Sequence, residues 1–107
     1  MIIVATLLAG AAGAVIRFLA SRLTTRGVLL VNVLGSFIAG LAMGATSDQS
    51  LLLVLVTGFC GGLTTFSAFA VETVQLVMSG KTRVALLSVG LNLVLGVGAA
   101  AVGFVLT

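Results

Sequence analysis

The spacing of the charged residues limits more than any other feature how this chain can fold. Only seven of the 107 residues are charged, five Lys or Arg and two Asp or Glu. The long uncharged stretches between them are residues 1–16, 27–47, 49–71 and 84–107. Three of these stretches reach the ~20 residues that an α-helix needs to cross a bilayer. The first stretch does so if Arg17 lies near its helix end, with the guanidinium turned toward the interface or a cavity.

The composition indicates that lipid is the solvent, because 61% of the residues are hydrophobic and a soluble domain of this size could not bury them. We therefore predict an all-α membrane protein with four transmembrane helices, folded as a single unit over residues 1–107. The expected helices cover residues 2–22, 27–46, 51–79 and 84–106. Their connections are so short that consecutive helices must be antiparallel neighbours.

Several classes of function are disfavoured. The net charge of +3 is carried mostly by two short loops, so it suits lipid headgroups better than nucleic acid. The single cysteine, Cys60, excludes an internal disulfide, and no spacing of metal-ligating side chains or nucleotide motif is present. We expect no enzyme. We also expect the N-terminal helix to belong to the mature protein, because no positive charge precedes its apolar run, as it would in a signal peptide.

Small residues recur at helical spacing on three of the expected helices. Such faces let helix backbones approach closely in lipid, where no hydrophobic effect drives helices together. We expect close packing at Ser36, Gly40, Gly44, Gly58, Gly62, Gly96 and Ala100.

The expected helix over residues 51–79 is too long for a simple span. At 1.5 Å per residue it would extend roughly 43 Å, against a hydrocarbon core of ~30 Å. The "CGGLTT" segment, residues 60–65, is the expected break, because paired glycines weaken a helix and hydroxyl side chains can bond to freed carbonyls. Non-helical backbone at membrane depth is tolerated only inside protein or beside a polar cavity, so the break predicts a site.

Three polar side chains within the spans need partners: Asn32, Glu72 and Asn92. For Asn92 we favour a hydrogen bond between helices, and for Glu72 a functional role. Thr65, Phe69 and Glu72 share one helical face, and Phe66 lies on an overlapping stripe. Aromatic rings have positive edges, so two rings beside hydroxyl and amide donors form a mildly electropositive lining. Such a lining suits a small anion that must lose its water without being trapped.

The run "GFCGGLTTFSAFAVET", residues 58–73, resembles the signature of the Fluc (CrcB) family of fluoride channels. "VNVLGSFIAG", which contains Asn32, and "GAVIRF", which contains Arg17, resemble two further motifs of that family. The resemblance covers most of the chain. It implies a passive fluoride channel of the bacterial plasma membrane, assembled as an antiparallel dimer with a structural sodium ion on its axis. Fluoride, lipid and a second subunit are then the expected partners.

The resemblance also implies roles for particular residues. The backbone carbonyls of Gly61 and Thr64 would bind the sodium ion, and Phe66 and Phe69 would border the fluoride path. Arg17 would lie near the pore entrance, where it either attracts anions or orients its helix. The implied anion pathway is formed by Asn32, Thr65, Phe66, Ser67, Phe69 and Glu72. The membrane potential, worth about 2.3 kcal/mol per charge per 100 mV, would drive fluoride out of the cytoplasm without coupling.

Two positions depart from the family pattern. The family commonly has threonine where this chain has Val28, four residues before Asn32, and a hydroxyl residue where it has Ala68. A tyrosine often found on the last helix is also missing, since the chain has no tyrosine. The polar track of this subunit is therefore depleted.

The loop charges predict one orientation in the membrane. Residues 22–26 and 80–83 carry four cations on one side, and the opposite side has no Lys or Arg. By the positive-inside rule, these two loops are expected in the cytoplasm and both termini outside. An antiparallel homodimer needs a chain that inserts both ways, so we consider a heterodimer with a homologous, oppositely inserted subunit beside the homodimer.

Two other classes of protein share features with this chain. Small multidrug transporters share the length, four helices and antiparallel dimers, but they need a carboxylate in the first helix, where this chain has only Arg17. A non-conducting subunit that orients a conducting partner stays open, because Val28 and Ala68 remove hydroxyls from the path.

Overall fold

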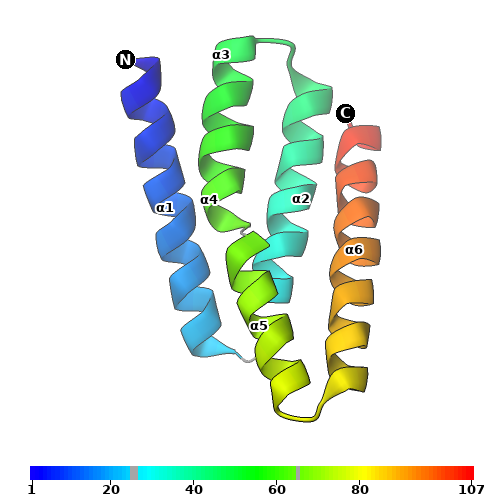
Figure 1. Ribbon diagram of the computed structural model, residues 1–107. Helices are drawn as coiled ribbons and strands as arrows, with labels where there is room; N and C mark the ends of the chain where they lie inside the picture. Colours follow the sequence, from blue (N-terminus) through cyan, green and yellow to red (C-terminus); the bar gives the residue numbers. More distant parts are fainter. Residues whose placement is uncertain (25–26, 65) are drawn as a thin grey trace.

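The computed structural model describes residues 1–24, 27–64 and 66–107, and the side chains of residues 66–68 fall outside that description. Every secondary-structure element in these residues is helical, as predicted (Figure 1). The elements are α1 (Ile2–Leu23), α2 (Gly27–Ala45), α3 (Gln49–Leu52), the π-helix η1 (Leu53–Cys60), α4 (Gly61–Leu63), α5 (Phe66–Met78) and α6 (Thr82–Val105).

Three of these helices, α1, α2 and α6, are long and apolar enough to cross a membrane. The remaining hydrophobic segment is divided. Its first part, Gln49–Leu63, runs continuously through α3, η1 and α4, and its second part is α5. Each part is shorter than the ~20 residues of a typical span. The expected helix limits agree with the observed ones to within two residues, apart from this interruption.

Consecutive helical segments run in opposite directions (Figure 1). The chain descends through α1, ascends through α2, descends again through α3 to α5 and ascends through α6, so both termini lie at the same end. The short connections predicted this arrangement. It leaves α1 parallel to the segment that ends in α4, and α2 parallel to α6. The fold measures 46 × 29 × 19 Å, which makes it a flat bundle whose long axis exceeds the ~30 Å hydrocarbon core.

The two parallel pairs pack through their small residues. A methyl group added at Gly40 of α2 would collide with the Ala100 carbonyl of α6, and one at Gly62 would collide with the Gly10 carbonyl of α1. The helix backbones can come this close because Gly40 and Gly62 carry no Cβ at the contact. The predicted packing role of these glycines is confirmed.

The core of the single chain is small, and its surface is apolar. The buried hydrophobic residues are Val28, Val31, Ala42, Cys60, Leu63 and Ala85. By contrast, large side chains such as Leu8, Leu86 and Val94 are about two-thirds exposed. A soluble monomer rarely exposes such continuous apolar surface, so this surface faces lipid or another subunit.

Candidate functional site

The helix break lies at Thr64. α4 ends at Leu63, Thr64 is extended at φ −97° and ψ 132°, and α5 begins at Phe66. The paired glycines do not form the break, because Gly61 is still helical at φ −63° and ψ −36°. The Cys60 carbonyl accepts hydrogen bonds from the Thr64 amide, at 2.8 Å, and from the Thr64 hydroxyl, at 2.7 Å. The side chain and backbone of Thr64 thus close the helix together.

The last turn before the break is fixed between two neighbouring helices. Gly62 lies against the backbone of α1, where a Cβ would meet the Gly10 carbonyl. On the other side, Gly35 of α2 leaves room for the Thr64 methyl group. Leu63 between them is 0% exposed. The glycine pair of the sequence therefore allows close approach to α1, and the extended Thr64 ends the helix.

Arg17 bonds to the broken helix. Its Nε donates a hydrogen bond to the Gly62 carbonyl at 3.2 Å. Carbonyls in the last turn of a helix have no partner within that helix, and in a membrane each such group is costly. The guanidinium of α1 supplies the missing donor. The sequence did not indicate this contact, and the choice between the two roles predicted for Arg17 stays a prediction.

A hydrogen-bonded chain joins α2 to α6. Asn32 Nδ2 donates to Asn92 Oδ1 at 2.9 Å, and Asn92 Nδ2 donates to the Ser88 carbonyl at 2.8 Å. The prediction that Asn92 links two helices is confirmed. Asn32 Oδ1 is buried and has no hydrogen-bond partner in the part of the chain that the structure describes.

The aromatic part of the predicted site lies on α5. Phe69 and Glu72 are both half-buried, and the Thr73 hydroxyl donates to the Phe69 carbonyl at 2.8 Å. Phe66 and Ser67 belong to the same helix, but their side chains lie outside the description, as does Thr65 altogether. The predicted pairing of the two rings stays a prediction.

The structure thus brings some predicted residues together and leaves others apart. Arg17 and Thr64 both donate hydrogen bonds to carbonyls just before the break, Arg17 to that of Gly62 and Thr64 to that of Cys60. Asn32 is bonded to Asn92 of α6 instead. It lies on α2 three residues before Gly35, the glycine that leaves room for Thr64. Sequence reasoning missed Ser88, although its position one turn before Asn92 on an expected helix is a usable signal.

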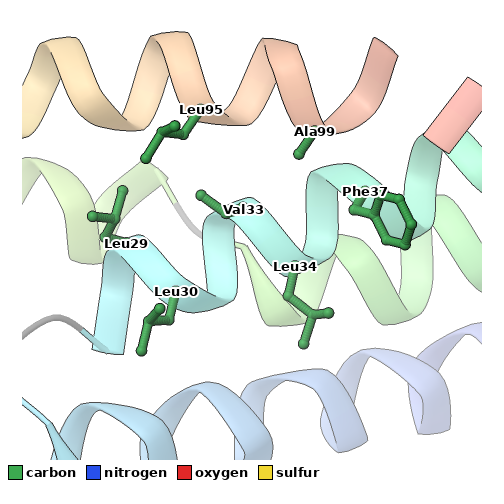
Figure 2. A pocket seen from close by; sticks show the side chains of 7 residues that line it. All are labelled: Leu29, Leu30, Val33, Leu34, Phe37, Leu95 and Ala99. Atoms are coloured by element: carbon green, nitrogen blue, oxygen red, sulfur yellow. The ribbon is translucent and has the colours of Figure 1, made fainter. Parts of the chain in front are cut away.

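A separate apolar groove lies between α2 and α6, with a volume of about 400 Å³. Figure 2 shows the side chains that line it: Leu29, Leu30, Val33, Leu34 and Phe37 from α2, and Leu95 and Ala99 from α6. No polar side chain contributes to this lining. An anion would find no donor here, so we do not place an ion path in this groove.

The described residues contain no cluster of three or more His, Cys, Asp and Glu side chains that could hold a metal ion. Together, the fold and site define a small helical membrane protein whose divided hydrophobic segment is held at its break by an arginine from a neighbouring helix.

Comparison with known proteins identifies the family. The chain belongs to the CrcB family, since the CrcB-like protein family (Camphor Resistance, CrcB) matches residues 4–104. It is 46% identical to the fluoride-specific ion channel FluC of Renibacterium salmoninarum, over 96% of each chain. It is 39% identical to FluC 2 of Rhodococcus jostii, over 100% of this chain and 99% of that one. Identity to FluC 1 of Nocardia farcinica is 42%, over 87% of this chain and 71% of the relative.

The resemblance inferred from the sequence is thereby confirmed. The family is one of ion channels, which agrees with the prediction that the chain is not an enzyme. A carboxylate-dependent multidrug carrier is set aside by the same match.

Proposed function

We propose that this chain is a subunit of a passive fluoride channel that exports fluoride from the bacterial cytoplasm and lowers its toxicity. One observation carries the proposal. The helix break lies inside the stretch that carries the family signature, immediately before the two phenylalanines on α5. The names of the relatives, which are fluoride-specific channels, support the choice of anion.

The divided segment would serve as the fourth span. Its helical parts, Gln49–Leu63 and Phe66–Met78, are each too short alone, but together they extend roughly 42 Å at 1.5 Å per residue. Backbone that leaves the helix at membrane depth needs protein or water around it. The contacts of Arg17, Gly35 and Gly62 supply protein from α1 and α2, and the exposed Gly61 marks the remaining face, which we assign to a second subunit.

Fluoride would move past Asn32, an amide donor, and between the ring edges of Phe66 and Phe69. Thr65 and Ser67 would add hydroxyls near the rings, and Glu72 would continue the polar path. Ring edges and neutral donors attract an anion weakly, so that it can be dehydrated and then released.

A sodium ion held by the carbonyls of Gly61 and Thr64 would fit the break. Gly61 is exposed in the single chain and lies in the last helical turn, where carbonyls lack helical partners. Thr64 has already left the helix. Oxygen ligands suit a hard cation, and a second subunit would complete the coordination. When bound, the ion would supply positive charge that balances these carbonyl dipoles and joins the subunits.

The second subunit would lie antiparallel to the first. With residues 22–26 and 80–83 in the cytoplasm, an identical copy inserted the other way would break the positive-inside rule, which favours a homologous chain with different loop charges as the partner. The numbered names FluC 1 and FluC 2 among the relatives fit organisms that hold more than one such chain. A homodimer is the alternative.

Fluoride efflux from vesicles tests these proposals. The chain would be reconstituted alone and with a homologous chain of opposite loop charge, and efflux would be followed with a fluoride electrode. We expect efflux, and we expect Phe69→Ile to lower its rate roughly tenfold or more, because about 1.4 kcal/mol at the highest barrier is a factor of ten. Phe104→Ile is the matched control, since Phe104 is 57% exposed on α6.

The outcomes separate the alternatives. Rapid efflux from the chain alone would exclude an obligate heterodimer. Efflux that needs the partner and is unchanged by Phe69→Ile would assign this chain a non-conducting, orienting role. Val28, which is buried one turn before Asn32 on α2, is compatible with that role because it offers the anion no hydroxyl. Absence of fluoride efflux from both preparations would contradict the channel function.

A further inference from the structure

We propose that Asn92 is a positioning residue that sets which side of the Asn32 amide faces the anion, an inference that rests on the proposed channel function. Asn32 and Asn92 lie on different helices, 60 residues apart, and their side chains form a direct hydrogen bond of 2.9 Å. Asn32 is the amide donor of the proposed path. Its orientation therefore decides whether the passing anion meets hydrogens or a carbonyl oxygen.

The orientation of both amides follows from one group that can only accept a hydrogen bond. The Ser88 carbonyl lies 2.8 Å from Asn92 Nδ2, so that atom must be the nitrogen. Asn92 Oδ1 then faces α2, and the atom of Asn32 that meets it must be its nitrogen. The Ser88 carbonyl thus determines, through Asn92, which end of the Asn32 amide is the nitrogen and which is the oxygen.

The amide nitrogen of Asn32 carries two hydrogens, and Asn92 takes one of them. The second is left to bind an anion on the same side. Asn32 Oδ1 is buried without a partner, a state that costs about 1–3 kcal/mol when the acceptor cannot reach water. Left to itself, the side chain would gain by turning Oδ1 toward any available donor. The bond to Asn92 opposes that rotation and keeps the donor side presented.

Two variants separate this role from simple packing. Asn92→Leu keeps the approximate size of the side chain and removes all three of its hydrogen bonds, to Asn32 and to the carbonyl and hydroxyl of Ser88. Ser88→Ala removes only the hydroxyl, whose oxygen is 3.5 Å from Asn92 Nδ2, and leaves the carbonyl that sets the orientation. Asn92→Leu is expected to release Asn32, and Ser88→Ala is the matched control.

The chain contains only two asparagines, so the side-chain amides can be observed directly. The protein would be made with asparagine carrying ¹⁵N in its side-chain amide, with its partner subunit where one is needed, and titrated with sodium fluoride and, separately, sodium chloride in lipid nanodiscs. We expect two NH₂ signals, one of which shifts with fluoride. In Asn92→Leu the remaining signal, from Asn32, should move from its wild-type position and lose most of its fluoride response. In Ser88→Ala both signals should respond as in the wild type.

Efflux is measured on the same variants, with a several-fold loss expected for Asn92→Leu and no change for Ser88→Ala. An unmoved Asn32 signal that keeps its fluoride response in Asn92→Leu would overturn the positioning role, whatever the efflux. If the wild type passes no fluoride and yet the Asn32 signal moves in Asn92→Leu, the channel function fails while the coupling of the two amides stands.

Discussion

At the scale of single residues, Arg17 acts at the break as a backbone N–H acts in an unbroken helix. Its Nε donates to the Gly62 carbonyl, which lies in the last turn of α4. Hydrogen bonds that involve a charged group contribute roughly 1.5–3 kcal/mol to stability. The cost of an arginine at membrane depth is thus offset by a bond that the broken backbone requires.

Replacing Arg17 should therefore destabilise the protein. We expect Arg17→Met, which keeps an unbranched side chain but has no donor, to lower the free energy of unfolding by roughly 1.5–3 kcal/mol, because the Gly62 carbonyl is left without its hydrogen bond. Thermal unfolding in detergent, followed by circular dichroism, would measure this loss. Lys81→Gln, in the exposed turn before α6, removes the same charge and should have almost no effect.

Arg17→Lys distinguishes the orienting role from the attraction of anions. It keeps the positive charge but lacks the Nε that makes the bond. If charge alone matters, this variant conducts fluoride like the wild type and is equally stable. Loss of stability in the lysine variant supports the orienting role.

At the scale of the helices, the sequence predicted where each segment lies but not how the segments bind one another. The uncharged runs predicted the limits of α2 and α6 to within two residues, because charges lie near the ends of membrane helices, whereas α1 continues past Arg17 to Leu23. The break lies at Thr64, inside the expected segment of residues 60–65, while the paired glycines before it stay helical. Gly62 packs there against the backbone of α1.

The contacts between helices could not be predicted from the sequence. Asn32 and Asn92 were both recognised as polar groups in need of partners, but their pairing depends on the register of α2 against α6. That register is set by glycine contacts such as Gly40 with Ala100. Spacing within one helix gives no information on its alignment with another. For the same reason, Arg17 could not be matched to Gly62.

The α2 to α6 register makes a prediction about glycine. Gly40→Ala places a methyl group against the Ala100 carbonyl, which is rigid backbone, so the helices must separate. We expect a loss of roughly 1–3 kcal/mol from the resulting overpacking. Gly90→Ala on α6 is the matched control, because nothing lies within 4 Å of the added methyl group. Alanine should there be neutral or slightly stabilising, given its better helix propensity.

Thermal unfolding in detergent compares the two alanine variants. A Gly40→Ala protein as stable as the wild type would mean that α2 and α6 tolerate separation, and the contact would then not set the register. The ¹⁵N signal of Asn32 offers a second measurement, because a shifted register should also disturb the bond to Asn92.

At the scale of the whole molecule, the chain is asymmetric in charge and incomplete in surface. Four of its five Lys and Arg residues fall within residues 22–26 and 80–83 of the sequence. Asp48, the N-cap of α3, lies at the end of the fold that holds both termini. The apolar exterior and the exposed Gly61 beside the break leave a face for another subunit. A chain that inserts in one orientation cannot supply its own inverted copy. The membrane orientation of this chain therefore determines whether the inverted subunit can be an identical copy.

Labelling of introduced cysteines measures this orientation. In a Cys60→Ala background, which removes the one native thiol, Ser47→Cys places a thiol between α2 and α3, and Ser79→Cys places one between α5 and α6. Both native serines are exposed. With a membrane-impermeant maleimide on spheroplasts, we expect the Ser47 variant to be labelled and the Ser79 variant to be protected until the membrane is permeabilised. Labelling of about half of each variant would show that the chain inserts both ways. The charge bias would then be too weak to orient it, and an identical copy would be the natural inverted partner.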